Sequence, residues 1–176
     1  MIDFSRNHFE LFGLPARFRF DPAVLERAWR ELQREIHPDR YATAGETERR
    51  LALQSSARVN EAYRALKDPV ARAQYLLSLH GIDVFHEADT VLPAEFLEQQ
   101  IERRHLAGEA YETRDARVLS ALLEEVRADI AEEERRLAVL LDVEGAWEAA
   151  RARVRELRFL VRLGTDVDAM LGALED

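Results

Sequence analysis

The chain has 176 residues, of which 47% are hydrophobic and 34% charged, with 7 glycines and 5 prolines, so it can bury a core in one domain or two small ones. Its formal net charge of -9 opposes binding to nucleic acid or an anionic membrane through the whole surface, and its lack of cysteine excludes disulfides and thiolate metal ligands. The N-terminus lacks an apolar signal core and no apolar run approaches the ~18 residues of a membrane span, so we expect a soluble cytoplasmic protein.

The first helices of the chain are predicted from their start signals. Asn7, followed three residues later by Glu10, resembles a capping box and opens a short helix that ends at Gly13. Asp21 followed by Pro22 begins a second helix. Its apolar stripe consists of Leu25, Ala28, Trp29, Leu32 and Ile36. Its opposite face carries Arg27, Arg30 and Arg34.

Two more helices are expected before residue 82. A capping-box pattern at Thr43 and Glu46 predicts a long third helix with an apolar stripe from Leu51 to Leu66, packed antiparallel to the second helix. The sequence Asp68-Pro69 repeats the start signal, and the fourth helix ends at His80-Gly81. No strand-like alternation is present, so the predicted fold class is all-α.

The tip of this predicted hairpin is the tripeptide His37-Pro38-Asp39. Pro38 disfavours helical backbone at His37, so the second helix ends there. Asp39 then lies in a short connection near several arginines, which suits a carboxylate offered to the guanidinium of a partner. On local chemistry alone, a simple helix stop is the alternative interpretation.

Residues 82–92 show no apolar stripe, so we predict domains at 1–81 and 93–176 joined by a linker at 82–92. The second domain is predicted to be a three-helix bundle. One helix runs from Pro93 to about Glu112, and two long stripes follow, 119–140 with one polar interruption at Glu133 and 143–161, with a turn at 142–145. Thr165 with Asp168 suggests the cap of a last short helix.

The helix that begins at Pro93 has apolar residues on two sides. Phe96, Leu106, Ala107 and Ala110 share one side, while Leu97 and Ile101 share another that acids border. The second side is either a modest partner-binding patch or part of a helix buried on both sides, and periodicity leaves both open. Phe159 lies off the stripe of its own helix, so it is predicted to be an exposed aromatic residue.

The helix that begins at Asp21, the His37-Pro38-Asp39 loop and the long third helix together resemble a J-domain, the module by which DnaJ-like co-chaperones engage heat-shock chaperone ATPases. Three further segments resemble the HscB family, the J-type co-chaperones of iron–sulfur cluster assembly. They are residues 11–17, 72–81 and 157–160. The resemblance covers nearly the whole chain, and the stretch Tyr-Leu-Leu-Ser-Leu-His-Gly at 75–81 is its most specific part.

This resemblance implies two partners and no cofactor or metal. The loop His37, Pro38 and Asp39 would trigger ATP hydrolysis by an HscA-type chaperone, with Arg27, Arg30 and Arg34 on the docking face. An IscU-type scaffold protein would bind the C-terminal bundle at Leu97, Glu98, Ile101, Glu102, His105, Glu109 and Phe159. Glu98 stands where the family often has an apolar residue and His105 where an acid is frequent, so a more polar patch is expected.

Three other functions are alternatives to this one. The five histidines show no metal-ligand spacing and no phosphate loop or nucleophile motif is present, so we expect no enzyme. A nucleic-acid binder could use the arginine-faced helix, but the net charge opposes it. A DnaJ-like adaptor for some other client would share the loop and differ only in the partner of the bundle.

Overall fold

The protein is described from a computed structural model that covers residues 3–41, 44–85 and 92–175, except for the side chains of residues 38, 39 and 175. The chain divides into two compact units, residues 1–76 and 77–176. Helices are present in both, and no strand occurs in the described ranges. The predicted all-α class is therefore confirmed. The division falls earlier than the predicted linker at 82–92, part of which lies outside the described residues.

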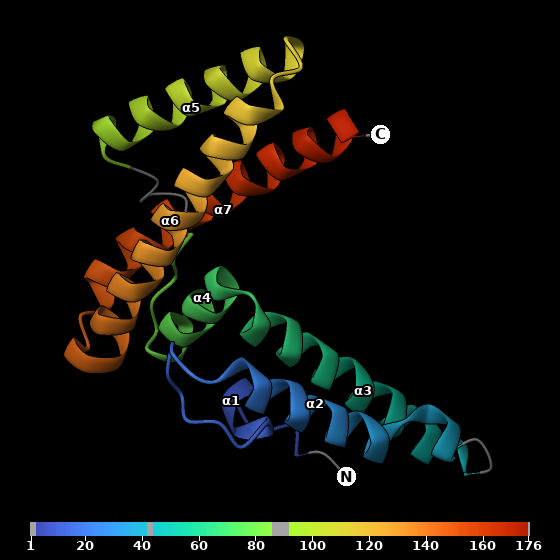
Figure 1. The fold of residues 1–176 in the computed structure, drawn as a ribbon. Coiled ribbons are helices and arrows are strands. Elements are labelled where there is room, and N and C mark those ends of the chain that lie inside the picture. The colour runs from blue at the N-terminus through green and yellow to red at the C-terminus, as the bar shows by residue number, and fades with distance from the viewer. Residues whose placement is uncertain (1–2, 42–43, 86–91, 176) are drawn as a thin grey trace. The chain divides into compact units, whose positions relative to one another are not determined.

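The first unit is built on an antiparallel helical hairpin (Figure 1). Helix α1 (His8–Leu11) has the predicted capping box between Asn7 and Glu10, and α2 (Pro22–Ile36) begins after Asp21, whose carboxylate accepts a hydrogen bond from the backbone N–H of Ala23. The short 3-10 helix η1 (Pro38–Tyr41) precedes α3 (Glu46–Lys67), and α4 (Pro69–Leu79) spans the division between the units. The predicted hairpin with residues 37–39 near its tip is thus present.

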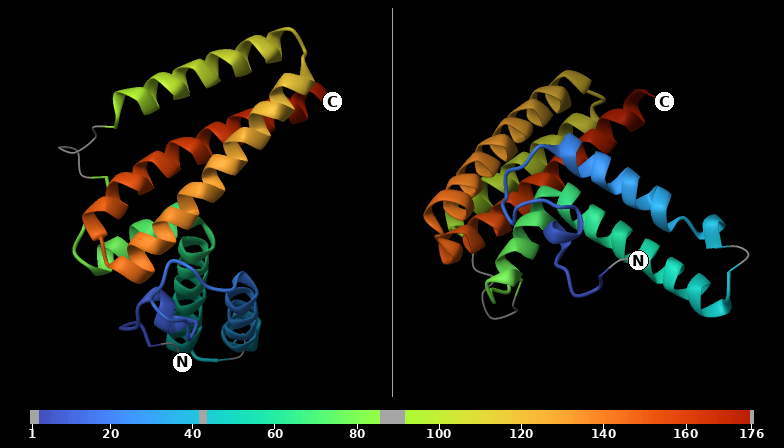
Figure 2. Two further views of the ribbon diagram at one scale, coloured as in Figure 1. Left: turned by 60° about the vertical axis from the view of Figure 1, so that its left-hand side comes forward. Right: turned by 90° about the horizontal axis from the view of Figure 1, so that it is seen from below.

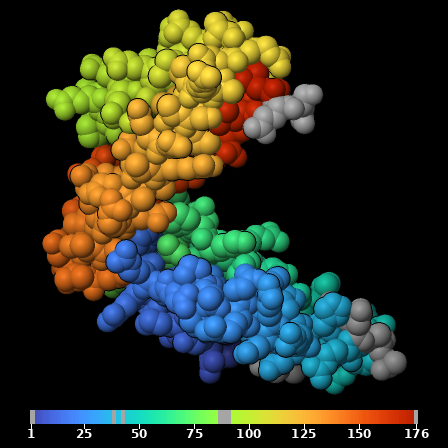
Figure 3. All heavy atoms as spheres, in the orientation of Figure 1, coloured from blue at the N-terminus to red at the C-terminus, as the bar shows by residue number. Residues whose placement is uncertain are grey.

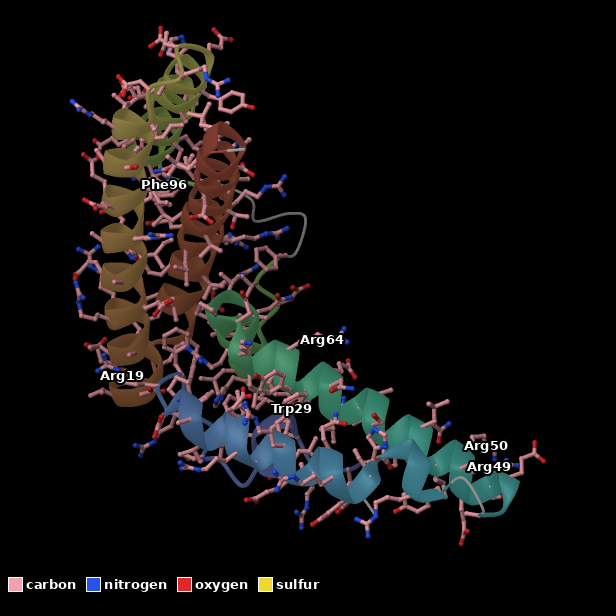
Figure 4. The ribbon with its side chains drawn as sticks, turned by 45° about the vertical axis from the view of Figure 1, so that its right-hand side comes forward. Arg19, Trp29, Arg49, Arg50, Arg64 and Phe96 are labelled. Atoms are coloured by element: carbon pink, nitrogen blue, oxygen red, sulfur yellow. The ribbon has the colours of Figure 1, made fainter. Side chains whose placement is uncertain are left out.

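The hairpin has an apolar core toward α1 and a polar seam between α2 and α3. Side chains from all three helices are fully or almost fully buried in the core: Phe9, Leu25, Val59, Ala62 and Leu66. In the seam, the rings of Trp29 and Tyr63 stack with their centroids 4.6 Å apart. Figure 4 shows Trp29 between the two helices. Asn60 Oδ1 accepts hydrogen bonds from Trp29 Nε1 at 3.1 Å and Gln33 Nε2 at 2.7 Å. These directional contacts fix how the two helices align.

The second unit contains a three-helix bundle (Figure 2, left). Its helices are α5 (Ala94–Glu112), α6 (Ala116–Val139) and α7 (Trp147–Glu175), and a wider π-helical turn η3 (Leu140–Glu144) ends at Gly145, which has φ 63°. The core joins all three helices through Ala107, Ala110, Leu119, Leu122, Leu123, Val126, Leu163 and Val167. The three-helix bundle predicted for this part of the chain is therefore confirmed.

Two predicted helix boundaries were wrong. Helix α3 begins at Glu46 with Gly45 as its N-cap, and no side chain caps it; Thr43, the expected cap, lies outside the described residues. No separate helix begins at Thr165, because α7 continues through it to Glu175. The Thr165 hydroxyl instead donates to the backbone carbonyl of Val161 at 2.9 Å, within the same helix.

The polar interruption predicted at Glu133 is an ion cluster between α6 and α7 in which Glu133 is buried and the arginines that meet it are partly exposed. Glu133 Oε1 accepts from Arg136 Nη1 at 3.0 Å and from Arg153 Nη1 at 3.3 Å, and Arg153 also contacts Glu156 Oε2 at 3.0 Å. Burial raises the pKa of the Glu133 carboxyl. Arg153 and Arg136 lower it, but by less than burial raises it. A charged residue is tolerated in the apolar stripe because cations from both helices meet it.

Candidate partner-binding sites

The first candidate site is the loop that follows α2. His37 ends the helix with φ -57° and ψ 128°, outside the helical region, as the following proline requires. Residues 38–41 then form η1, where the backbone N–H of Arg40 donates to the carbonyl of His37 at 3.0 Å. Arg40 Nη1 also donates to the carbonyl of Arg34 at 3.1 Å. The loop is thereby fastened to the end of α2, and His37 is exposed there. The side chains of Pro38 and Asp39 lie outside the described part of the structure.

The outer face of α2 leads to this loop, and its side chains form part of the surface of the first unit seen in Figure 3. Arg27, Arg30 and Arg34 are all exposed and recur at helical spacing, as predicted. The sequence reasoning missed the acids beside them: Glu31 and Glu35 are exposed on the same helix, and Glu26 Oε1 lies 2.9 Å from Arg30 Nη2. The face is therefore an alternation of both signs and not a purely basic stripe.

Glu26 connects this face to the seam between the helices. Its Oε2 accepts a hydrogen bond from the Tyr63 hydroxyl, while its Oε1 accepts from Arg30 Nε at 3.0 Å. The Tyr63 hydrogen bond, followed by the one from Arg30, lowers the pKa of the Glu26 carboxyl, and Glu26 in turn raises the pKa of Tyr63. Arg30 is thus held in place through Glu26 by a residue of α3.

Other cations flank the loop from the start of α3. Figure 4 places Arg49 and Arg50 near the end of the hairpin at which the loop lies, and both are exposed. They lie in the first turns of α3, a few residues after η1. Sequence reasoning did not single them out, because without the fold they are two more charges on a helix.

The second candidate site lies on α5 and α7. Leu97 is 37% exposed, Ile101 67% and Phe159 40%, so α5 is not buried on both sides. The rings of Phe96 on α5 and Phe159 on α7 meet edge to face with their centroids 6.4 Å apart. This contact brings the two helices together where the exposed apolar residues lie. We call Leu97, Ile101 and Phe159 the apolar patch.

The remaining predicted residues of this site follow α5 on its outer side. Glu98, Glu102, His105 and Glu109 are all exposed, and His105 Nδ1 lies 3.6 Å from Glu109 Oε2. The structure therefore brings the predicted residues of α5 onto one side of the helix. The prediction that Leu106 shares the side of Ala107 and Ala110 is wrong, because Leu106 is 44% exposed whereas both alanines are buried. The buried side instead includes Gln100, only 4% exposed, because its position faces the bundle whatever its polarity.

Sequence reasoning also missed the cations on the α7 side of the patch. Arg158 and Arg162 are exposed and flank Phe159 along α7, and the Arg158 guanidinium lies 4.4 Å from the centroid of the Phe85 ring. Their spacing around Phe159, at one residue before it and three after it, was the available signal. The patch thus has acids beyond it on α5 and bases beside it on α7.

The described residues were also compared with the geometry of a metal site. Groups of three or more His, Asp or Glu side chains with the geometry to hold a metal ion are absent from them. Within those same ranges, no helix is long and apolar enough to cross a membrane.

Comparisons with known proteins agree with this architecture. Residues 92–168 match the family model described as the HSCB C-terminal oligomerisation domain. A co-chaperone protein HscB homolog from Burkholderia multivorans is 44% identical over 175 residues, which cover 99% of both chains. The solved structure of chaperone HscB from Vibrio cholerae has a TM-score of 0.86 and 36% identity, covering 96% of this chain and 99% of that one. Human co-chaperone protein HscB has a TM-score of 0.88 and 26% identity, covering 96% and 83%.

The helical hairpin with its His37-Pro38-Asp39 loop, followed by a three-helix bundle, defines the class of J-type co-chaperones. The chain belongs to the HscB co-chaperone family.

Proposed function

We propose that this protein assists iron–sulfur cluster assembly by delivering an IscU-type scaffold protein to an HscA-type chaperone and stimulating ATP hydrolysis by that chaperone. Its membership in the HscB family supports a co-chaperone role. The observation that carries the proposal is the presence of two separate candidate surfaces in two separate units, the loop after α2 in one and the apolar patch in the other.

The chaperone would bind the first unit. In this proposal Asp39 pairs with an arginine of the chaperone, and His37 and Pro38 hold the loop in the shape that presents it. Arg27, Arg30 and Arg34 form the docking face, supported by their exposure along α2. The acids Glu31 and Glu35 on the same face favour a protein partner with charges of both signs over a polyphosphate.

The scaffold would bind the second unit. Leu97, Ile101 and Phe159 supply the apolar centre, and exposed apolar residues within a charged surround are typical of a contact surface. Glu98, Glu102, His105 and Glu109 form its border on α5. Holding both partners on one chain raises their effective concentration for each other. The stimulation itself requires contacts that differ between the two states of the chaperone.

The protein would act without an active site of its own, as a cytoplasmic co-chaperone that needs no cofactor. Catalysis in this proposal belongs to the ATPase. The absence of cysteine means that a cluster carried by the scaffold would find no thiolate ligand on this chain.

The decisive experiment is single-turnover ATP hydrolysis by the HscA-type chaperone, with the scaffold and this protein added separately and together. We expect synergy between them, and we expect Asp39→Asn to abolish the contribution of this protein, because the neutral amide cannot form the charged pair. The scaffold should still bind Asp39→Asn with unchanged affinity. Full stimulation by Asp39→Asn would show that the loop does not act in this way.

The apolar patch is tested by calorimetric titration of the scaffold into the double variant Leu97→Ala/Ile101→Ala. We expect at least about tenfold weaker binding, the loss typical of truncating central contact residues. Stimulation measured without scaffold should stay at the wild-type level. Unchanged scaffold affinity would reject the patch and leave the bundle with another client.

A further inference from the structure

The C-terminal end of α2 lacks one of its regular hydrogen-bond donors. In an α-helix each carbonyl accepts from the N–H four residues later, so the regular donor to the carbonyl of Arg34 would be residue 38. Residue 38 is a proline, which has no N–H to donate. The Arg34 carbonyl therefore needs another donor, and it lies at the end of the helix where the carbonyls carry the negative pole of the helix dipole.

The side chain of Arg40 supplies a donor to this carbonyl. Its Nη1 donates to the carbonyl oxygen of Arg34 at 3.1 Å, so the chain folds back over the proline to reach the helix that it has just left. The guanidinium brings both a hydrogen-bond donor and a positive charge to the C-terminus of α2, and both are favourable there. A side-chain donor at residue 40 thus takes the place of the backbone donor that Pro38 removes.

Other contacts of η1 hold Arg40 where it can reach α2. The backbone N–H of Arg40 donates to the carbonyl of His37 at 3.0 Å, and the N–H of Ala44 donates to the carbonyl of Tyr41 at 3.0 Å. The Tyr41 side chain is half-buried, and its hydroxyl lies 3.5 Å from the carbonyl oxygen of Glu35 in the last turn of α2. The loop is therefore closed against the end of the helix by backbone and side-chain contacts together.

We infer that Arg40 is a positioning residue for the His37-Pro38-Asp39 loop, because its guanidinium replaces the N–H that Pro38 lacks and holds the loop in one shape at the end of α2. This contact exists within the chain and needs no partner. Its effect on ATP hydrolysis rests on the proposed function, which assigns the loop to the chaperone. Arg40 then acts through the loop and not as one more charge of the docking face.

The contact is tested first in the protein alone, by NMR of the Arg34 carbonyl carbon, which is deshielded when its oxygen accepts a hydrogen bond. Arg40→Met keeps the length of the side chain and removes its donors, whereas Arg40→Lys keeps a donor and the charge. Arg17→Met changes the net charge equally at an exposed arginine that precedes α2. We expect the Arg34 signal to move upfield in Arg40→Met and to move much less in the other two variants. An unchanged Arg34 signal in Arg40→Met would overturn the inference.

The part played by the proline is tested by urea unfolding in a second background. Pro38→Ala restores an N–H at residue 38, so the Arg34 carbonyl can regain its backbone donor. Arg40→Met should then lower the urea midpoint by more in the wild-type background than in the Pro38→Ala background, since the two changes affect the same carbonyl. Equal losses in both backgrounds would show that Arg40 does not replace the missing donor, which overturns the inference. Circular dichroism checks that each variant is folded.

Stimulation of the HscA-type chaperone separates positioning from docking. Titrating each variant gives the maximal stimulated rate and the concentration that produces half of it. We expect Arg40→Met to lower the maximal stimulation by about fivefold or more, because the bound loop holds its active shape for less of the time. The half-maximal concentration should stay within about twofold, and the loss should persist at high salt, which screens a docking charge. Arg40→Lys should recover part of the stimulation, and Arg17→Met should keep all of it.

The outcomes separate this inference from the proposed function. A raised half-maximal concentration with an unchanged maximal rate would make Arg40 a docking contact and overturn its positioning role. Full stimulation by Arg40→Met, despite a shifted Arg34 signal, would also overturn that role, while the proposed function would still stand or fall with Asp39→Asn. If the wild-type protein does not stimulate the chaperone, the proposed function fails, and the Arg34 signal alone then supports or overturns the hold of Arg40 on the loop.

Discussion

Tyr63, in the seam between α2 and α3, restricts the position of Arg30 on the outer face of α2 through Glu26. Its ring stacks on Trp29 in the seam between α2 and α3, and its hydroxyl donates to Glu26, which holds Arg30 on the outer face. Arg30 is therefore held in a restricted set of positions, so less conformational entropy would be lost if a partner bound it as proposed.

The variant Tyr63→Phe separates the hydroxyl from the ring. Without that hydrogen bond we expect the pKa of Glu26 to rise toward its ordinary value of 4.5. The lowered pKa of Glu26 stabilises the folded state above pH 4.5, and this contribution is lost as the pH falls through the lowered value. The wild-type advantage over Tyr63→Phe should therefore be largest near neutral pH and shrink in acid.

Carboxyl chemical shifts from an NMR titration give the Glu26 pKa directly, and urea unfolding at several pH values gives the stability difference. Tyr111→Phe, at an exposed tyrosine on α5, is the matched control. An unchanged Glu26 pKa in Tyr63→Phe would show that Arg30 alone holds the carboxylate.

At the scale of single elements, the sequence predicted helices well where a cap and a stripe agreed. The Asn7–Glu10 capping box and the Asp21-Pro22 start both appear as expected, because these signals are local. The helix start predicted at Thr165 was wrong because the hydroxyl of a threonine inside a helix can donate to a backbone carbonyl of the preceding turn instead of capping a new helix.

Burial within α5 was harder to predict, since it depends on where α6 and α7 lie and not on α5 itself. The polar Gln100 is buried and the apolar Leu106 is exposed, which is the reverse of what their polarity predicts. For the same reason, the exposed side with Leu97 and Ile101 could be suspected from sequence but not decided.

Gly145 ends the turn between α6 and α7, and its backbone conformation predicts the cost of replacing it. Its φ of 63° is left-handed, and an added Cβ would meet the Trp147 ring at an ordinary distance of 3.7 Å, so the cost comes from the backbone. We expect Gly145→Ala to lower the free energy of unfolding by about 1–2 kcal/mol. Gly172→Ala, inside α7 with no atom near its added Cβ, should raise it by about 0.5–1 kcal/mol.

Thermal and urea unfolding of the two glycine variants measure both changes. Opposite signs are the expected result. A loss of stability at both positions would mean that α7 tolerates no change near its end, and that backbone conformation is not what distinguishes the two glycines.

At the scale of the whole molecule, each unit has its own buried core and its own tryptophan. Trp29 stacks on Tyr63 in the first unit, and Trp147 stacks on His80 in the second with ring centroids 3.7 Å apart. Fluorescence of Trp147→Phe therefore reports on the first unit, and fluorescence of Trp29→Phe reports on the second.

Truncating a core residue in one unit should affect that unit most. Leu25 is 2% exposed, so Leu25→Ala is expected to cost about 2–5 kcal/mol in the unfolding transition seen by Trp29, with a smaller shift in the transition seen by Trp147. Leu119→Ala, at a fully buried position of α6, should show the reverse. Equal shifts of both signals would show that the two units unfold as one.

The alternation of arginine and glutamate along α2 bears on which partners the proposed docking face would accept. A helix face of a single sign attracts every acidic surface it meets, whereas an alternating face is repelled wherever the opposing charges fall out of step. Under the proposed function, Glu31 and Glu35 would weaken binding to an ATPase with mismatched charges more than binding to the matching one. The selectivity of the proposed docking face would then come from the partners that it repels as well as from the one that it attracts.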